Sequence, residues 1–544
     1  MQHIWRPSVS IVLGVGSAIA AFVLYLMTLA PTLSSGWRGM GVDGAELLAA
    51  ANTLGVPHPS GYPTYMLFLK AFGSIVAIGD FAYRGNLASA VLGALTVGLL
   101  YWLTLLIARK KYRDTPESLL AIVSAFAALT FGAAPIFWSQ SVITEVYTLN
   151  AVFVGGLAVL AAHIVLGTQG SKRRTAWDVH RLLATFGLIL GVGLGNHLTL
   201  LAIAAPLAVW TWIETRPRLS SIAWGFVGLA VGLSIYAYLP IRAGAGPPVN
   251  WGDASSTEGF VWMLTGQAYQ DYVFGIPLDS FIARLADWLD LVFTQFNPLG
   301  LFFVLVGIAA VAKTEKWLLL ATLLSVAVLF GYAMSYNTFD AKVLTIPAFF
   351  LLSAYSGIGL LSVLTNLSRW ASEGSRHRSR SRSSKNVLKG WRSAPITLAV
   401  AFVAVPFGSV AFNYSSQDLS DDWGVLEFAE AALDMAAPRS VIIGDGEAKT
   451  FALWYEAFVE RPESEVIPIS ARLFQFDWYG PSLNDRHPGR LPTEWPDDVL
   501  GALEAIIDHS ATDPGVYLTY FSPDLAEKYM LSLQPHGLYK VELR

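Results

Sequence analysis

The segment NLASAVLGALTVGLLYWLTLLIARKK, residues 86–111, decides the fold class of this sequence. It carries no charged side chain until it ends in Arg109, Lys110 and Lys111. An α-helix rises 1.5 Å per residue, so about 20 apolar residues cross a hydrocarbon core about 30 Å thick. The segment therefore predicts a helix that crosses a membrane and ends on its cytoplasmic side, where basic residues collect.

Ten other apolar stretches of the chain resemble this one. The chain of 544 residues is 54% hydrophobic and 14% charged, whereas about a quarter of the residues of a soluble protein are charged. The composition therefore predicts an all-α polytopic membrane protein with about 11 transmembrane helices. The predicted spans are 9–30, 86–108, 118–138, 145–167, 182–196, 198–213, 221–241, 298–312, 317–335, 343–366 and 394–412.

Lysine and arginine are unevenly divided between the loops that join these spans. Alternate loops, beginning with the N-terminal segment, hold 21 of them, and the opposite loops hold six, which are Arg38, Lys70, Arg84, Arg242, Arg284 and Lys342. The positive-inside rule places the first set in the cytoplasm, and the N-terminus with it. Eleven spans then place the segment after Phe412 on the extracytoplasmic side. The basic loop 367–393 is predicted to be a disordered tether near anionic lipid rather than a nucleic-acid-binding arm.

Residues 413–544 have the composition of a soluble domain, with 23 acidic and nine basic side chains. Short apolar runs at 441–443, 466–469 and 516–518 alternate with helical patterns at 497–508 and 522–532, which predicts a small extracytoplasmic α/β domain. The turn Gly444-Asp445-Gly446-Glu447 follows the first predicted strand. It is either a plain strand-to-helix turn or a place where backbone N–H groups hold an anion.

The absence of cysteine excludes several classes of site. The chain has no cysteine, so a disulfide scaffold, a zinc-thiolate centre, an iron–sulfur cluster and a cysteine nucleophile are ruled out. Ionisable residues at the outer ends of the spans are the remaining candidates for chemistry, because charges are costly in a membrane and mark functional sites there.

The first predicted outer loop, 31–85, contains two carboxylates at helical spacing. An Ala/Leu-rich helix is expected over 45–54, and Asp43 and Glu46 lie three residues apart at its start, so both can face the same side. One interpretation is a capping box, with Asp43 as the N-cap and Glu46 as the residue that reaches back to it. The other is a carboxylate pair that acts as a general base. The spacing is compatible with both.

The segment that follows this helix is stiff. His58-Pro59-Ser60-Gly61-Tyr62-Pro63 contains two prolines, which fix φ and restrict the residues before them. The segment is either a rigid connection back to the membrane or a means of holding His58 and Tyr62 beside the carboxylates.

Further polar and aromatic residues recur at the outer ends of other predicted spans. Each one has an ordinary explanation, such as a helix-end histidine at 197 or an arginine at 242 that extends toward water. Together they suggest an outer-leaflet site for an anionic lipid head group. Aromatic residues in the large outer loop 243–297 suit either sugar stacking or anchoring at the interface. The candidate residues are Glu145, Tyr147, Asn196, His197, Arg242, Trp251, Asp340 and Lys342.

Several of these motifs also resemble a known family. Asp43-x-x-Glu46, followed by Leu54-Gly55-Val56-Pro57-His58-Pro59-Ser60-Gly61-Tyr62-Pro63, is similar to the signature of a former domain-of-unknown-function group of the GT-C superfamily. The eukaryotic relative of that group is the transmembrane O-mannosyltransferase of plexin IPT domains. Four other motifs occur in the same order: 195–197, 238–242, 250–253, and 444–447 with Trp454-Tyr455.

The resemblance implies a GT-C module over 1–412 and an enzyme that takes a sugar, mannose by analogy, from a polyprenyl-phosphate carrier. Asp43 or Glu46 would accept the proton of a protein Ser or Thr hydroxyl, with inversion at the sugar, and Arg242 and His197 would bind the donor phosphate. His58, Tyr62 and the outer-end residues would line the site. No cofactor is required, and no ligand spacing demands a metal, although Asp43, Glu46 and Asp340 could hold a divalent ion. The sequence leaves two alternatives open: transfer to a lipid-linked glycan, and a lipid or glycan transporter with an outer domain.

Overall fold

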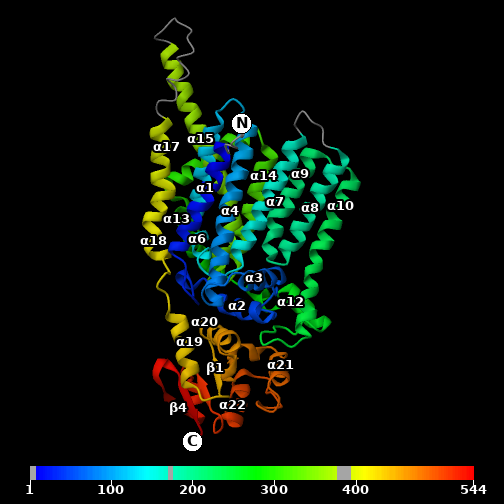
Figure 1. Cartoon of the computed structure of the whole chain (residues 1–544), viewed down its shortest axis with the longest axis vertical. Helices are drawn as coiled ribbons and strands as arrows, with labels where there is room; N and C mark the ends of the chain where they lie inside the picture. The colour runs from blue at the N-terminus through cyan, green and yellow to red at the C-terminus, as the bar shows by residue number, and fades with distance from the viewer. Residues whose placement is uncertain (1–7, 169–174, 377–393) are drawn as a thin grey trace, which may run out of the picture.

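The structure, a computed structural model, describes residues 8–168, 175–376 and 394–544. Within these ranges, ten helical segments are long and apolar enough to cross a membrane, and they lie side by side in the upper body of Figure 1. The chain is therefore a multi-pass membrane protein, as the sequence predicts. The helical segments are α1 (Val9–Met27), α4 (Phe81–Lys111), α7 (Tyr147–Thr168), α8 (Ala176–Leu194), the continuous η2–α9 (Leu198–Leu200, Leu201–Thr215), the continuous α10–η3–α11 (Leu219–Leu233, Ser234–Ala237, Tyr238–Ala243), α13 (Phe281–Ala312), α14 (Lys316–Ser335), the continuous η6–α15 (Ala341–Thr345, Ile346–Arg376) and the continuous α17–η7–α18 (Ala394–Phe402, Val403–Phe407, Gly408–Gln417).

The predicted span 118–138, the third along the chain, is two helices rather than one. Helix α5 (Glu117–Gly132) has 16 residues, which gives it a length of about 24 Å, and it packs inside the bundle against α1, α4 and α15. Helix α6 (Pro135–Gln140) follows it. Ala134, between them, has the extended backbone that a following proline favours, so Pro135 ends the span early.

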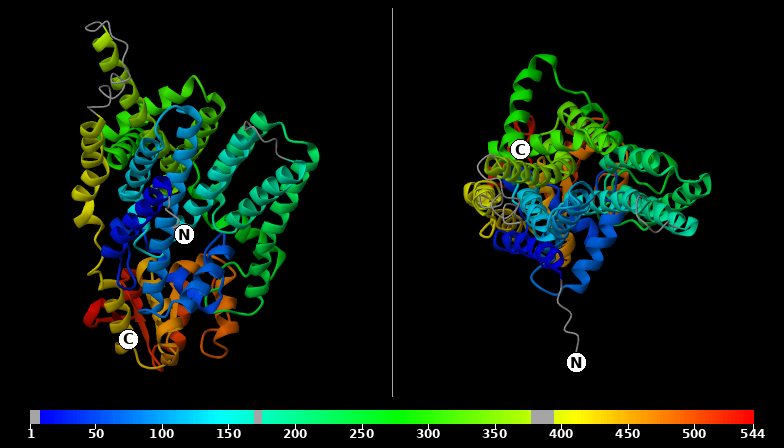
Figure 2. Two further views of the ribbon diagram at one scale, coloured as in Figure 1. Left: turned by 45° about the horizontal axis from the view of Figure 1, so that its top comes forward. Right: turned by 90° about the horizontal axis from the view of Figure 1, so that it is seen from above.

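Helices α8 and α10 form a pair at the edge of the bundle, seen in Figure 2. A Cβ atom on Gly187 would lie 1.9 Å from the carbonyl oxygen of Gly225, and one on Gly228 would lie 2.0 Å from that of Ala184. Only glycine fits at such distances, so these residues allow the two backbones to approach closely, as small residues do in membrane helix pairs. Helix α7 joins this pair to the main bundle through its contacts with both α8 and α4.

A layer of short helices covers the end of the bundle that faces the C-terminal domain (Figure 1). It contains α2 (Gly44–Thr53), α3 (Pro63–Ile75) and α12 (Thr257–Thr265). Helix α2 confirms the helix expected over 45–54, whereas α3 was not predicted. Helix α13 begins at Phe281, inside the predicted outer loop 243–297, and it passes Pro298 with a break at Asn297, whose φ is 49°. The prolyl residue explains why the sequence pattern placed the start of this span at 298.

The C-terminal part of the chain forms a five-stranded sheet with helices around it. The strand order is β2-β1-β3-β5-β4, in which β1, β2 and β3 are parallel and β4 and β5 are antiparallel. The three predicted strands and the first predicted helix are confirmed. The helix predicted over 522–532 is confirmed only as far as Lys528, because strand β4 begins at Met530. The elements are β1 (Val441–Gly444), β2 (Ile467–Ser470), β3 (Val516–Leu518), β4 (Met530–Leu533), β5 (Tyr539–Glu542), α19 (Gly424–Met435), α20 (Glu447–Tyr455), α21 (Tyr479–Arg486), α22 (Val499–Ser510) and α23 (Pro523–Lys528).

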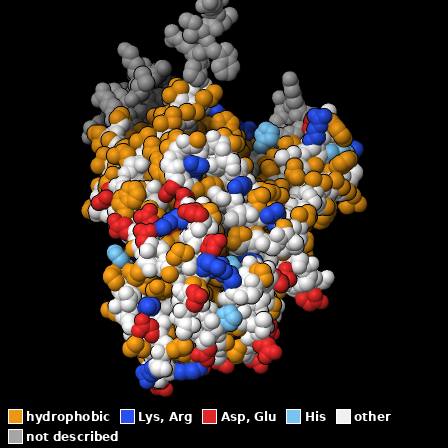
Figure 3. All heavy atoms as spheres, turned by 60° about the horizontal axis from the view of Figure 1, so that its bottom comes forward, with side chains coloured by type: hydrophobic (Ala, Val, Ile, Leu, Met, Phe, Trp, Pro, Cys, Tyr) orange, Lys and Arg blue, Asp and Glu red, His pale blue; other side chains and the backbone are white. Residues whose placement is uncertain are grey.

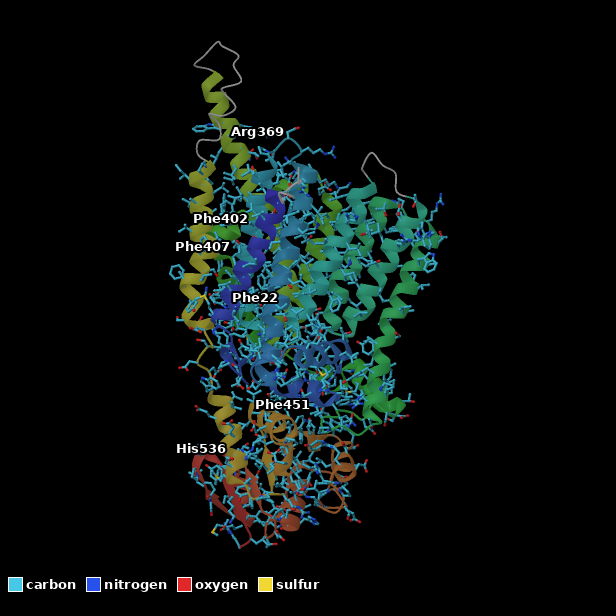
Figure 4. The ribbon with its side chains drawn as sticks, viewed as in Figure 1. Phe22, Arg369, Phe402, Phe407, Phe451 and His536 are labelled. Atoms are coloured by element: carbon cyan, nitrogen blue, oxygen red, sulfur yellow. The ribbon has the colours of Figure 1, made fainter. Side chains whose placement is uncertain are left out.

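This C-terminal domain is docked onto the layer of short helices. Helix α20 packs against α2, and Phe451 on α20 lies at the boundary between the two parts in Figure 4. The backbone N–H of Ala82 donates to the hydroxyl of Tyr455 at 3.0 Å. Arg486 donates to the carbonyl of Pro248, and the ring of Trp478 lies 6.1 Å from that of Trp251. Contacts from three separate segments therefore fix the domain over the helix that carries the two candidate carboxylates.

The two ends of the molecule differ in surface character. Charged side chains spread over the C-terminal domain, which Figure 3 brings forward, while hydrophobic side chains dominate the helical part behind it. Arg369 on α15 and His536 in the C-terminal domain lie at opposite ends of the molecule (Figure 4). Residues 377–393 of the predicted basic loop and Lys172, Arg173 and Arg174 lie outside the described residues.

Candidate active site

The candidate carboxylate pair, Asp43 and Glu46, does not form a capping box. Asp43 precedes α2, but its side chain makes no capping hydrogen bond. Glu46 is completely buried and turns to His58 instead: one oxygen accepts from the backbone N–H of His58 at 3.0 Å, and the other lies 2.5 Å from Nδ1. A buried carboxylate needs a charged or hydrogen-bonding partner, and the stiff segment after α2 supplies it.

His58 lies between the two carboxylates. Its Nε2 is 3.0 Å from the hydroxyl of Tyr62 and 3.8 Å from a carboxylate oxygen of Asp43. Burial on its own would lower the pKa of His58, but the charges of Glu46 and Asp43 outweigh it and raise the pKa to about 10. The imidazole is therefore protonated at neutral pH, and it forms a charge cluster with the buried Glu46 and the partly exposed Asp43.

The position of His58 is fixed by contacts with the large outer loop. Val56 and Asn250 form an isolated parallel β-bridge, in which the N–H of Val56 donates to Val249 at 2.8 Å and that of Trp251 donates to Val56 at 3.0 Å. The rings of Trp251 and Tyr269 lie edge-on to His58, each with a centroid distance of 6.1 Å. Two outer segments that are distant in sequence therefore hold one imidazole.

The two acids differ in their access to the cavity beside them. The side chain of Asp43 is 29% exposed and lines the cavity, whereas Glu46 lies behind it. Burial raises the pKa of Asp43 to about 7, the charge of His58 opposes this, and the charges of Glu46, Asp340 and Glu447 add to it. A carboxyl group with such a pKa can accept a proton near neutral pH.

The cavity has a volume of about 1190 Å³ and joins two environments. Its polar end is lined by residues of the outer layer and of the C-terminal domain: Asp43, His58, Tyr62, Tyr147, His197, Tyr269, Tyr336, Asp340, Glu447 and Arg472. From there an apolar groove follows the facing sides of two membrane helices. Helix α9 contributes Leu201, Ala205, Val209 and Ile213, and α14 contributes Leu320, Leu324, Val328 and Tyr332.

Six of the residues predicted for the site line this cavity. They are Asp43, His58, Tyr62, Tyr147, His197 and Asp340. Three others lie behind its wall. Asn196 donates to the carbonyl of Val146 at 3.1 Å, Trp251 packs against His58, and Glu145 is buried, where burial and then the charge of Asp43 raise its carboxyl pKa well above the usual range. These three support the site without lining it, as does Glu46.

His197 lines the cavity in its neutral form. Burial, and then the positive charge of His58, lower its pKa to about 4. Its Nδ1 accepts a hydrogen bond from the backbone N–H of Thr199 at 3.3 Å, so the ring proton is on Nε2. His197 therefore offers a hydrogen-bond donor to a ligand, rather than the positive charge that the sequence suggested.

The structure does not bring Arg242 or Lys342 to the cavity lining. The Nε of Arg242 donates to the carbonyl of Leu54 at 2.7 Å, and a terminal nitrogen donates to that of Thr53 at 3.4 Å. These carbonyls belong to the last turn of α2, where a cation is favoured by unpaired oxygens and the helix dipole. The arginine thus completes the helix that carries Asp43, and the expectation that it contacts a ligand phosphate is not supported by its position.

Two charged residues of the cavity are not among the site residues that the sequence predicts. Glu447 and Arg472 both come from the C-terminal domain, far along the chain from Asp43. Glu447 belongs to the Gly-Asp-Gly-Glu turn, for which the sequence suggests a role of the backbone N–H groups and none of the carboxylate. The strand preceding Arg472 was also predicted, and the rule that ligands bind beyond the carboxyl ends of parallel strands could have drawn attention to both.

Asp43, Glu46 and His58 offer ligand atoms that lie within 4.8 Å of one another. Among the described residues, these three are the group of acids and histidines that could hold a metal ion. Their arrangement is that of a hydrogen-bonded ion pair. Two ligands at about 2.0–2.1 Å from a tetrahedral zinc lie about 3.3 Å apart, whereas Glu46 and Nδ1 of His58 are 2.5 Å apart. A metal would have to displace a proton and separate these two atoms.

Comparison with known proteins agrees with the resemblance noted in the sequence. Residues 43–220 match the family model of the protein O-mannosyl-transferase TMEM260 N-terminal domain. Protein O-mannosyl-transferase tmem260 of Dictyostelium discoideum is 23% identical over 503 residues, which are 85% of this chain and 57% of that protein. TMEM260 of Mus musculus is 24% identical over 482 residues, 86% of this chain and 64% of that protein. The chain thus spans about six-tenths of the length of these relatives.

The fold has a counterpart among solved structures. The crystal structure of ArnT from Cupriavidus metallidurans bound to undecaprenyl phosphate superimposes with a TM-score of 0.55, over 98% of this chain and 97% of ArnT, at 12% sequence identity. At this identity the likeness establishes the fold, which is the GT-C type predicted from the sequence, with a small sheet domain after the membrane helices.

Proposed function

We propose that this GT-C-type membrane protein, a relative of the TMEM260 protein O-mannosyl-transferases, transfers a sugar from a polyprenyl-phosphate carrier to an acceptor hydroxyl. The names of the relatives point to mannose as the sugar and to protein as the acceptor. Undecaprenyl phosphate, the ligand in the ArnT structure, points to a polyprenyl carrier.

The single observation that carries the proposal is the continuity of the cavity. An apolar groove between α9 and α14 opens into a chamber that contains Asp43, His58 and further polar side chains. A polyprenyl-phosphate sugar has the same division into a long apolar chain and a compact polar head. Its chain would lie along the groove within the membrane, and its anomeric carbon would then lie in the chamber that Asp43 lines.

Asp43 is the proposed general base. The acceptor oxygen forms a bond to the anomeric carbon while the bond from that carbon to the phosphate oxygen breaks. The acceptor proton passes to the Asp43 carboxylate, and the bonding electrons leave with the polyprenyl phosphate. Such a single displacement inverts the anomeric centre. A positioned general base contributes roughly 10²–10⁴-fold to the rate.

Glu46 and His58 are proposed to position this base. His58 lies 3.8 Å from Asp43 and is held by two contacts to Glu46, so its charge opposes the rise in the pKa of Asp43. Nε2 of His197 offers a hydrogen bond to the donor, and the rings of Tyr62 and Tyr269 form apolar walls against which a sugar can pack.

The reaction is proposed to occur on the extracytoplasmic side. Three features support this sidedness: the excess of Lys and Arg in the loops at the other end, the position of Arg369 at that end (Figure 4), and the position of the C-terminal domain over the chamber. A lipid-linked donor in the outer leaflet would reach the groove sideways between α9 and α14.

The proposal is tested by reconstituting the purified chain in liposomes that contain radiolabelled polyprenyl-phosphate mannose. Candidate acceptor proteins are added outside, and label is measured in the protein, glycolipid and aqueous fractions. Transfer to protein, with release of polyprenyl phosphate in equal amount, is the expected result.

Two outcomes would contradict it. Label that appears in glycolipid with the proteins unmodified would replace the protein acceptor with a lipid-linked glycan. Movement of intact donor between the leaflets, at a rate that Asp43→Asn does not change and without any transfer, would identify a transporter instead.

A further inference from the structure

The carboxyl ends of two parallel strands in the C-terminal domain face the chamber. Strands β1 and β2 pair with Gly444 opposite Ser470, and each is followed at once by charged residues: Asp445 and Glu447 after β1, and Arg472 after β2. Ligands of parallel sheets bind beyond this edge of the strands. Glu447 and Arg472 both line the cavity, so the sheet presents its usual binding edge to the polar end of the groove.

Arg472 differs in charge from the other residues that line this cavity. It is the one Lys or Arg among the described lining residues, whose other ionisable side chains include the acids Asp43, Asp340 and Glu447. His197 is neutral there, and the charge of His58 is shared with Glu46 and Asp43. A phosphate that enters the chamber therefore meets one guanidinium that is not committed to the buried cluster.

The side chain of Arg472 is held loosely enough to change partners. Its Nε lies 3.4 Å from a carboxylate oxygen of Asp445, and the two side chains are 57% and 48% exposed. Exposed pairs of this kind contribute little to stability. A phosphate carries more charge than a carboxylate and accepts two parallel N–H bonds from the planar guanidinium, so it competes well with Asp445.

We propose that Arg472 binds the phosphate of the polyprenyl-phosphate donor, so that the C-terminal domain completes the donor site. This assignment rests on the proposed function. It transfers to Arg472 the role that the sequence suggested for Arg242, whose guanidinium is occupied by the carbonyls that end α2. Glu447 and Arg472 line the same cavity as Asp43 and His58, so Arg472 faces the chamber in which the sugar would be transferred.

The test compares Arg472→Gln and Arg472→Lys with a matched control, Arg439→Gln. Arg439 is an exposed arginine of the same domain, it pairs with Glu465 at 3.6 Å, and it does not line the cavity. Each full-length variant is placed in nanodiscs of neutral phospholipid, and its melting temperature is checked. Binding of radiolabelled, sugar-free polyprenyl phosphate is then measured, together with the KM for the sugar donor.

We expect Arg472→Gln to weaken binding of polyprenyl phosphate roughly 10- to 100-fold and to raise the donor KM in parallel, since a hydrogen bond to a charged group contributes about 1.5–3 kcal/mol. Arg472→Lys should recover part of the loss, and Arg439→Gln should bind like the wild type. Unchanged binding in Arg472→Gln, with the wild-type melting temperature, would overturn the assignment.

Competition identifies the source of the phosphate. Inorganic phosphate should displace the radiolabelled lipid only weakly, because it lacks the chain that fills the groove, and phosphatidylglycerol should displace it much less than unlabelled polyprenyl phosphate does. Equal displacement by phosphatidylglycerol would overturn specificity for the donor. If the wild type binds polyprenyl phosphate through Arg472 but transfers no sugar, the proposed function fails and the binding site stands. If transfer is normal and Arg472→Gln binds normally, the binding site alone fails.

Discussion

Replacing Glu46 with glutamine removes the negative charge behind His58 and leaves the size of the side chain almost unchanged. Glu46 is completely buried, and its two oxygens contact the backbone N–H and Nδ1 of His58 at 3.0 and 2.5 Å. The amide of glutamine can keep the backbone hydrogen bond but carries no charge. The variant therefore leaves a protonated imidazole with Asp43, 3.8 Å away, as its remaining carboxylate partner.

The size of the effect follows from this burial. Removing one partner of a buried ion pair costs about 3–5 kcal/mol. We expect Glu46→Gln to lower the free energy of unfolding by about 3 kcal/mol at pH 6.5, the lower end of that range, because His58 can release its proton and relieve part of the cost. The control is Glu117→Gln, which removes a carboxylate that is 46% exposed from its pair with Arg109. An exposed pair contributes about 0–1 kcal/mol.

Unfolding by SDS in mixed micelles, followed by tryptophan fluorescence, measures both variants against the wild type across a range of pH. The pKa of His58 is raised from 6.5 to about 10 in the folded protein. Its contribution to stability is therefore complete below pH 6.5 and is lost as the pH rises through 10, so the gap between wild type and Glu46→Gln should narrow over that interval. A loss of less than about 1 kcal/mol at pH 6.5, or a gap that widens with pH, would refute the buried pair.

Three further predictions concern pH, metal and sidedness. The value of kcat/KM for sugar transfer should rise with pH through about 7 as Asp43 loses its proton, and a rate that falls over pH 6–8 would exclude it as the base. Prolonged dialysis against EDTA should leave the transfer rate within about twofold, because Glu46 and His58 already satisfy each other, and a loss that zinc or magnesium restores would contradict this. The chain has no cysteine, so single substitutions can report sidedness: Glu463→Cys on the C-terminal domain should react with an impermeant maleimide on intact cells, and Asp114→Cys between α4 and α5 only after permeabilisation. The reverse pattern would invert the topology.

The membrane helices were readable from the sequence because their signal is local. A run of about 20 apolar residues is sufficient to identify a span, and ten predicted spans have counterparts in the structure. The apolar pattern is a poorer guide to the ends of a helix where the segment contains a proline. Pro135 divided one predicted span into α5 and α6, and Pro298 hid the first half of α13, which begins at Phe281.

The site was readable only in part, because its partners come from distant segments. The spacing of Asp43 and Glu46 fits a capping box, and local rules cannot foresee that a buried Glu46 turns to His58. Arg242 was a reasonable candidate from its position beside a span, but its partners are the carbonyls at the end of α2. Arg472 reaches the chamber only because the C-terminal domain docks onto α2 through α20, a contact that no sequence pattern contains.

The central claim is that Asp43 accepts the proton of the acceptor in the chamber at the end of the groove. The most direct measurement is the single-turnover rate of sugar transfer by Asp43→Asn at saturating polyprenyl-phosphate mannose, with donor binding measured on the same sample. The account predicts a rate lower by roughly 10²–10⁴-fold, with donor affinity within about threefold of the wild type. A variant that binds the donor normally and transfers sugar at the wild-type rate would contradict it.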